Sequence, residues 1–251
     1  MWNRREFTVA SIAALSAPIF AEAANAPAAS VVVDLRHEVG PLPHIWSRCA
    51  GSDRAAVTLR EEWRRDLSRF RNETGVERVR FHGIFADELG VWLAGRTPNF
   101  QNVDAVYDGL LERGVQPFVE LSFMPEALAR AGTYIFHWQG CTAPPRDYRR
   151  WEALIRAFTR HCVDRYGLAE VRRWYFEVWN EANIGFWSGN QQEYWALYDA
   201  AAAAIKSVDA ALKVGGPASA GAEWVREILD HCAETDTPID FVSYHGYPTD
   251  E

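Results

Sequence analysis

Short β-rich segments alternate with longer amphipathic segments over most of this 251-residue chain. Apolar residues recur at helical spacing in the amphipathic segments, for example over residues 59–70. The β-rich segments include residues 46–51 and others that end near residues 83, 123, 181, 217 and 247, and 31–33 is a further short candidate. Strands that alternate with helices form parallel β-α units, in either an open doubly wound sheet or a (β/α)8 barrel.

The positions of polar residues favour the barrel. No G-x-G-x-x-G follows an early strand and no G-x-x-x-x-G-K-[ST] occurs, so the nucleotide-binding form of the open sheet lacks its usual motif. His82-Gly83, Asn180-Glu181 and His245-Gly246 fall at C-terminal strand ends, where barrel enzymes carry their active sites. The sequence therefore predicts an α/β fold, a (β/α)8 TIM barrel. With about six of eight β-α units identifiable, we expect this barrel to be incomplete.

The N-terminus has the features of an export signal. Arg4-Arg5 precedes an apolar run over residues 9–15, and small residues with A-x-A spacing follow up to Ala26. We predict a signal peptide at 1–26, similar to a bacterial twin-arginine signal, with an ordinary export signal as the alternative. Residues 27–251 would then form the N-terminal part of a barrel in a periplasmic or extracellular protein. No segment reaches about 18 apolar residues, so no stable membrane span is predicted.

Composition narrows the range of partners. The net charge is −8 and no basic run occurs, which argues against nucleic acid. Eleven Trp residues are enough both to fill a core and to stack on sugar rings. The four Cys residues are widely spaced and contain no C-x-x-C pair, so buried free thiols are favoured over a zinc site; a disulfide stays open. Nothing in the sequence predicts the oligomeric state.

Residues 174–181 combine a strand-like composition with two acids, Glu177 and Glu181. A buried charge without a partner is costly, so acids in a strand need a reason. Alternation along a strand would place Glu177, Trp179 and Glu181 on one face, with Glu181 at the open end. Glycoside hydrolysis is one reaction that uses two carboxyl groups, and in retaining enzymes these lie roughly 5–5.5 Å apart. Along an extended strand Glu177 would lie about 13 Å from Glu181, which is too far for such a pair. We therefore expect Glu177 to be a buried structural acid paired with an Arg.

Residues 177–181 resemble the acid/base strand of clan A glycoside hydrolases. The surrounding sequence is similar to glycoside hydrolase family 39, and to its β-xylosidase branch rather than its α-L-iduronidase branch. The matching segments follow one another in order and are residues 80–87, 117–125, 177–181, 214–218 and 240–245. Such a series of matches is far more specific than a lone Asn-Glu pair.

The resemblance implies a retaining β-xylosidase that acts by double displacement on a xylo-oligosaccharide or an aryl xyloside, without a cofactor. It implies that Glu181 is the general acid/base and that Asn180 hydrogen-bonds the sugar 2-hydroxyl. His82, His245 and Tyr247 would hold other hydroxyls. The looser candidates for pocket walls are Phe136, Trp138 and Trp187. The alternatives for the sugar specificity are an iduronidase-like or β-glucosidase activity. A metal site formed by His82, His245 and Glu181 is disfavoured, because metal-dependent barrel hydrolases usually have H-x-H on the first strand and none occurs here.

The sequence departs from the family pattern in two ways. Ala182 stands where the family usually has Pro after the acid/base, a change that we expect to affect rigidity more than chemistry. The family's nucleophile is a Glu on the seventh strand, and we expect that residue beyond residue 251. Neither Glu120 in mid-strand nor the terminal acids Asp250 and Glu251 are obvious substitutes. A further alternative is therefore a catalytically inactive fragment.

Overall fold

The computed structural model describes residues 34, 36, 40–93 and 97–248. The chain divides into two compact units, Met1–Pro43 and His44–Glu251, and the fold below is that of the second unit. The predicted signal peptide at 1–26 and the short strand at 31–33 lie outside the described residues.

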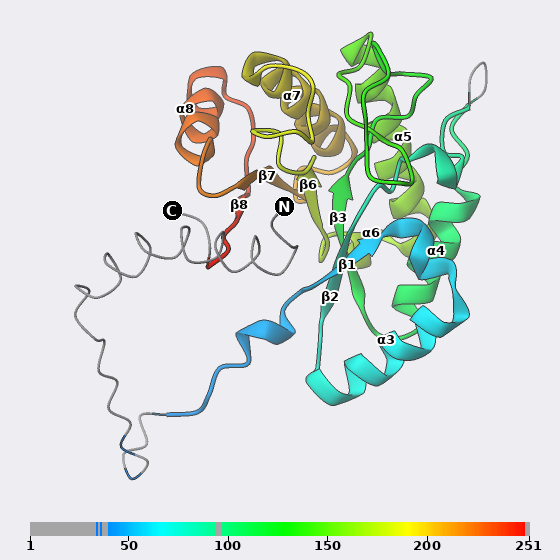
Figure 1. The fold of residues 1–251 in the computed structure, drawn as a ribbon, viewed down its shortest axis with the longest axis vertical. Coiled ribbons are helices and arrows are strands. Elements are labelled where there is room, and N and C mark those ends of the chain that lie inside the picture. The colour runs from blue at the N-terminus through cyan, green and yellow to red at the C-terminus, as the bar shows by residue number, and fades with distance from the viewer. Residues whose placement is uncertain (1–33, 35, 37–39, 94–96, 249–251) are drawn as a thin grey trace, which may run out of the picture. The chain divides into compact units, whose positions relative to one another are not determined.

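Six parallel strands form one curved sheet, and their order in the sheet follows their order in the chain (Figure 1). The strands are β1 (Ala50–Arg54), β2 (Arg78–His82), β3 (Gln116–Leu121), β6 (Tyr175–Val178), β7 (Lys213–Ala220) and β8 (Phe241–His245). The predicted α/β fold is confirmed as a curled partial barrel. Its first strand begins four residues later than the predicted segment 46–51, and residues 45–47 form a short 3-10 helix.

Helices connect successive strands and lie along one side of the sheet (Figure 1). They are α3 (Glu61–Thr74), α4 (Gln101–Leu111), α5 (Tyr148–Tyr166), α6 (Leu168–Val171), α7 (Gln191–Val208) and α8 (Val225–Thr235). Short 3-10 helices occur at Ala55–Leu59 and Asp87–Leu89, and the two-residue strands β4 (Tyr134–Ile135) and β5 (Gly140–Cys141) form a small hairpin. The described residues include no helix long and apolar enough to cross a membrane.

Local sequence explains where the principal helices begin and end. Asn190 and Glu193 form a capping box at the start of α7, which satisfies two backbone N–H groups that have no partner inside the helix. The side chain of Asp147 accepts from the backbone N–H of Arg149 at the start of α5. Gly75 ends α3 with φ 73°, a left-handed conformation that glycine adopts without a steric penalty.

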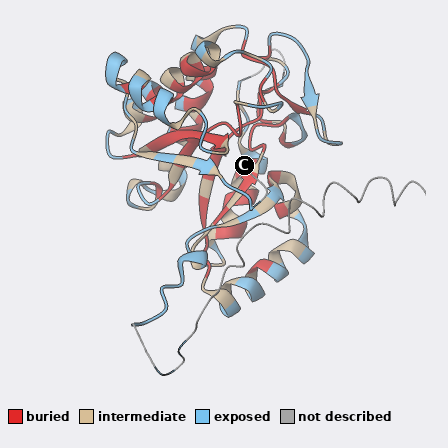
Figure 2. Cartoon of the chain, turned by 60° about the vertical axis from the view of Figure 1, so that its left-hand side comes forward, coloured by how far each residue is buried: buried red, intermediate tan, exposed pale blue. Residues whose placement is uncertain are grey.

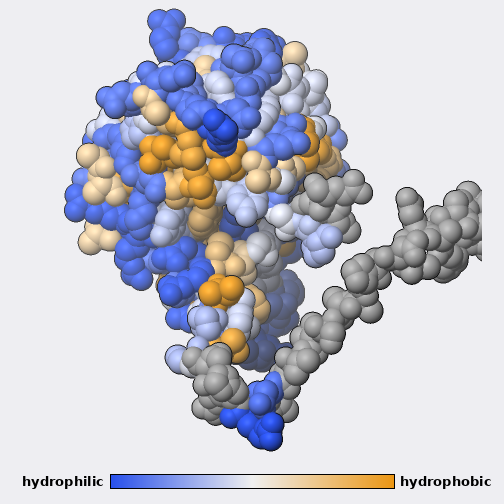
Figure 3. Space-filling view, turned by 90° about the vertical axis from the view of Figure 1, so that its left-hand side faces the viewer, coloured by the Kyte–Doolittle hydropathy of each residue, from blue (hydrophilic) through white to orange (hydrophobic). Residues whose placement is uncertain are grey.

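The hydrophobic core lies between the strands and the inner faces of the helices (Figure 2). Trp151, Phe158 and Tyr198 from the helices are fully buried there, together with Phe176 of β6. Three cysteines are buried as expected, but Cys49 is exposed, and all four are free thiols. Apolar residues also reach the surface among hydrophilic ones (Figure 3), and they include Val242 and Tyr244 on β8, an outer strand of the described sheet.

Candidate active site

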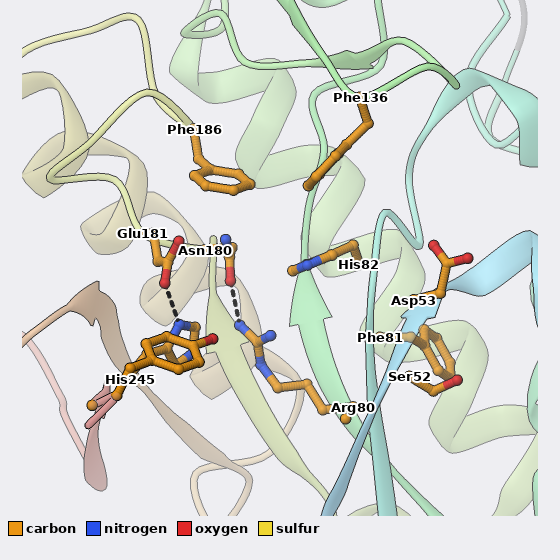
Figure 4. Close-up of a pocket in the computed structure, with 13 residues that line it drawn as sticks. Ser52, Asp53, Arg80, Phe81, His82, Phe136, Asn180, Glu181, Phe186 and His245 are labelled. Atoms are coloured by element: carbon orange, nitrogen blue, oxygen red, sulfur yellow. Dashed lines mark hydrogen bonds and ion pairs between the residues drawn. The ribbon is translucent and has the colours of Figure 1, made fainter. Parts of the chain in front are cut away.

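A pocket of about 600 Å³ opens at the C-terminal ends of the strands (Figure 4). All five residues that the sequence singled out as catalytic or substrate-binding line this pocket: His82, Asn180, Glu181, His245 and Tyr247. They come from the ends of β2, β6 and β8, so the parallel topology brings together side chains that are up to 165 positions apart (247 minus 82).

Glu181 lies three residues beyond β6 and is held by both its backbone and its side chain. Its backbone N–H donates to the carbonyl of Ala218 at 2.8 Å, which ties the loop to β7. Its Oε1 lies 2.7 Å from Nδ1 of His245, within hydrogen-bond distance. Only 9% of Glu181 is exposed, so this carboxyl group is largely buried yet reaches the pocket.

Arg80 organises the base of the pocket. Its Nε donates to Glu177 at 2.6 Å and its Nη1 lies 2.8 Å from Glu120, so one guanidinium serves two buried carboxylates. Burial acts against the charged guanidinium, but the two carboxylates raise the pKa of Arg80 above its ordinary value. The pairing of Glu177 with an Arg confirms the expectation that Glu177 is a buried structural acid.

Asn180 is oriented by the same guanidinium. Nη2 of Arg80 donates to Oδ1 of Asn180 at 2.9 Å (Figure 4). The amide nitrogen Nδ2 of Asn180 is buried and has no hydrogen-bond partner among the described residues. Asn180 lines the pocket, and both N–H donors of its amide are unused by the described residues.

His82 rests on Glu120, a residue that the sequence analysis had set aside as a mid-strand acid. Nδ1 of His82 lies 2.8 Å from Oε2 of Glu120, and the hydroxyl of Ser122 donates to the other carboxylate oxygen. Burial acts to raise the pKa of Glu120, but Arg80 and His82 hold it below its ordinary value. Burial likewise acts to lower the pKa of His82, but Glu120 raises it, which favours the imidazolium. Nδ1 is thereby committed to Glu120, and Nε2 remains available to the pocket.

Aromatic rings form one wall of the pocket. Phe136 and Phe186 lie on the same side in Figure 4, and Phe136 stacks on His82 with ring centres 5.7 Å apart. Of the three looser candidates, only Phe136 lines the pocket. Trp138 stacks behind Phe136 at 5.2 Å, and Trp187 is 5% exposed and packs on Trp179. Phe186 was missed because it lies in a loop without periodicity.

Glu177, Trp179 and Glu181 do not share one face, so the prediction from simple alternation was wrong. Strand β6 ends at Val178, and Trp179 takes a left-handed backbone conformation with φ 72°. Its ring is fully buried against Trp151 of α5, in the layer of helices, while Glu177 and Asn180 both meet Arg80. The turn at Trp179 thus reverses the alternation just before the two pocket residues.

Asp53 is a second pocket carboxylate that the sequence analysis did not identify. It lies at the end of β1, where the register with β2 shifts, and 53% of its side chain is exposed. Figure 4 shows Asp53 on the opposite side of His82 from Glu181. The described residues contain no group of three or more His, Cys, Asp or Glu arranged to hold a metal ion.

Comparison with known proteins shows the family of this chain. The profile described as "Glycosyl hydrolases family 39" matches residues 29–251. The chain belongs to glycosyl hydrolase family 39. Among its relatives, a β-xylosidase of Caldicellulosiruptor saccharolyticus is 45% identical over 226 residues, 88% of this chain and 46% of that protein.

Other relatives agree with this membership. A crystal structure of a monomeric β-xylosidase from Caulobacter crescentus CB15 has a TM-score of 0.81 and 42% identity, over 86% of this chain and 45% of that chain. An α-L-iduronidase of Mus musculus is more distant, at 27% identity over 68% of this chain and 28% of that protein. The chain spans about half the length of the family 39 β-xylosidases that it matches.

Proposed function

We propose that this chain carries the donor-sugar site and the general acid/base of a retaining β-xylosidase. The observation that carries this proposal is the position of Glu181. It reaches a pocket at the C-terminal strand ends, beside an Asn180 amide with two unused N–H donors and beside His245. The 45% identity to a β-xylosidase, against 27% to an iduronidase, supports xylosides over uronides as substrates.

In the first step, Glu181 donates its proton to the glycosidic oxygen as the bond from that oxygen to the anomeric carbon breaks and the second carboxylate, the nucleophile, forms an ester bond to that carbon. In the second step, the ionised Glu181 removes a proton from a water molecule whose oxygen bonds to the anomeric carbon as the ester bond breaks, which releases xylose and the free nucleophile. The 2.7 Å contact with His245 keeps the carboxyl group directed into the pocket. Asn180 donates from Nδ2 to the 2-hydroxyl oxygen, and His82 and Tyr247 contact other hydroxyls of the same sugar.

The second carboxylate is assigned from the family pattern to the seventh strand of the barrel, and the six-stranded sheet of the described residues does not include that strand. Asp53 reaches the same pocket, but His82 lies between it and Glu181 (Figure 4). A nucleophile and an acid/base need carboxyl groups roughly 5–5.5 Å apart on either side of the scissile bond. We therefore assign Asp53 to sugar binding.

The assignment of the nucleophile to a strand outside the described sheet favours a second candidate function for the 251-residue chain by itself, namely sugar binding without turnover. Both candidates are tested with an aryl β-xyloside. One sample is the 251-residue chain, and the other, the completed chain, is the same polypeptide followed by the C-terminal remainder of the Caldicellulosiruptor relative. We expect little release of the aryl group from the first sample and turnover from the second. Full turnover by the 251-residue chain would contradict the assignment of the nucleophile.

We also propose that residues 1–26 direct export through the twin-arginine route, on the basis of Arg4-Arg5 and the apolar run that follows. In a bacterial host, the fusion of residues 1–26 to a reporter enzyme should reach the periplasm. Replacement of both arginines by lysine should retain the reporter in the cytoplasm. Export that survives this change would favour the ordinary export signal.

A further inference from the structure

A second, smaller cavity of about 120 Å³ lies at the opposite end of the strands from the pocket. Arg78 and Gln116 are the first residues of β2 and β3, whereas the pocket opens at the C-terminal ends of the strands. The cavity is lined by Arg71, Glu77, Arg78, Gly114, Gln116 and Arg173. It belongs to the second unit alone, and the proposed glycosidase chemistry makes no use of it.

Positive charge exceeds negative charge around this cavity. Glu77 is shared by two guanidinium groups, with Arg48 at 3.1 Å and Arg78 at 2.9 Å. Arg173 pairs with Glu170 at 3.1 Å. Glu170 also accepts from Gln116 and Trp174, so Arg173 shares this carboxylate with two other donors.

Arg71, in the last turn of α3, adds a further cation. Its guanidinium makes no hydrogen bond or ion pair with the described residues, although it lines the cavity. The lining thus carries three guanidinium groups and one carboxylate, Glu77, in a protein whose net charge is −8. Such a local excess attracts an anion.

Arg78, like Arg71, has a hydrogen-bond donor without an acceptor in the described part of the chain. Its Nε is buried and has no acceptor among the described residues. Its guanidinium lies 5.3 Å from the centre of the Tyr175 ring, and Lys213 Nζ lies 4.4 Å from the same ring. An unsatisfied buried donor on a charged group is costly, so an acceptor at this place would stabilise the fold.

We propose that this cavity binds a small tetrahedral oxyanion, phosphate or sulfate, through Arg71, Arg78 and Arg173. Guanidinium groups bind the oxygens of such anions in pairs of parallel, charge-assisted hydrogen bonds. The cavity of about 120 Å³ has room for one such anion. A free anion and the terminal group of a phosphate monoester present the same chemistry.

The proposal is tested by calorimetric titration of the 251-residue chain with inorganic phosphate and with sulfate, at constant ionic strength set with sodium chloride. We expect one site per chain with a dissociation constant of ~1 mM. Arg71→Ala and Arg173→Ala should each weaken binding at least tenfold. Arg173 has 64% of its side chain exposed and neither arginine is a buried core residue, so their loss should leave the fold intact, which circular dichroism would verify.

The matched control is Arg65→Ala. Arg65 is on the same helix α3, its side chain is 69% exposed, and it does not line the cavity. It should bind phosphate like the unchanged protein. Equal binding by all variants, or no heat of binding for either anion, would overturn the proposal. Titration with glycerol 2-phosphate distinguishes a free anion from the terminal group of a phosphate monoester. An affinity equal to that of inorganic phosphate shows that the cavity accepts a monoester, and tenfold weaker binding shows that it takes the free anion.

Discussion

Nη2 of Arg80 donates a 2.9 Å hydrogen bond to Oδ1 of Asn180, and this bond determines what the Asn180 amide presents to a ligand. With its oxygen occupied, the amide presents its nitrogen, a donor, to the pocket. Arg80 is held in turn by Glu120 and Glu177 on the two neighbouring strands β3 and β6. A buried ion cluster therefore orients a side chain that we assign to substrate binding.

Replacement of Arg80 by alanine should destabilise the fold strongly, because Glu120 and Glu177 would remain buried without a cation. We expect the free energy of unfolding to fall by about 3–5 kcal/mol in urea titrations. Arg80→Lys keeps the charge but cannot reach three acceptors, so its loss should be smaller. An alanine variant as stable as the unchanged protein would show that this cluster contributes nothing to stability.

The pair formed by His82 and Glu120 predicts a specific dependence of stability on pH. Glu120 raises the pKa of His82 above 6.5, so the contribution of His82 is complete below pH 6.5 and is lost as pH rises through the folded-state pKa. The pKa of Glu120 lies below 4.5, so its contribution is lost only as pH falls through that lower value. The pair should stabilise most between about pH 4.5 and 6.5.

The measurement is the free energy of unfolding from pH 5 to 9 for the unchanged protein and for His82→Gln. The variant cannot become positively charged, so the stability difference should be largest near pH 5–6 and should shrink towards pH 9. A difference that grows as the pH rises would mean that His82 is neutral in the folded state.

Asp53 should bias the pocket towards neutral sugars. The guanidinium of Arg80 is already bonded to Glu120, Glu177 and Asn180, so it offers no free cation to a uronate. Asp53→Asn should improve binding of glucuronate about fivefold relative to xylose, which corresponds to ~1 kcal/mol for a screened like-charge contact. Calorimetric titration measures both affinities. Asp230→Asn, on α8 and 66% exposed, is the control that should change neither.

Ala182 occupies the second position of a turn in which the N–H of Ile184 donates to the carbonyl of Glu181 at 3.1 Å. Proline is favoured at this position of a β-turn, which gives a physical reason for the family's usual Pro. Ala182→Pro should therefore raise the free energy of unfolding by about 0.4–1 kcal/mol, through a more restricted unfolded chain. Destabilisation in urea titrations would mean that the backbone at residue 182 cannot accept the proline ring.

The sequence predicted the strands and the location of the pocket because both depend on local patterns. Alternating β-rich and helical segments indicate parallel β-α units, and polar residues at strand ends indicate the open end of a barrel. The ends of β2 and β8 lie within two residues of the predicted ends.

What the sequence did not predict depends on register and backbone conformation. Glu120 reaches His82 and Arg80 only because β2 and β3 pair in the register that sets Arg80 beside Phe118. The left-handed turn at Trp179 reverses the direction of the following side chains and cannot be deduced from alternation. Arg80, a charged residue between the buried Val79 and Phe81 of β2, was the available signal that a buried acid such as Glu120 lies nearby.

The central claim is that Glu181 is the acid/base of a retaining glycosidase, and it is tested most directly by Glu181→Ala in the completed chain. Without the acid, hydrolysis of an aryl xyloside with a poor leaving group should slow by about 10²–10⁴-fold. A 2,4-dinitrophenyl leaving group needs no protonation, so the first step should survive and azide should restore turnover. The expected product is β-xylosyl azide. Unchanged hydrolysis by the variant, or the absence of both rescue and azide product, would contradict the assignment of Glu181 as the acid/base.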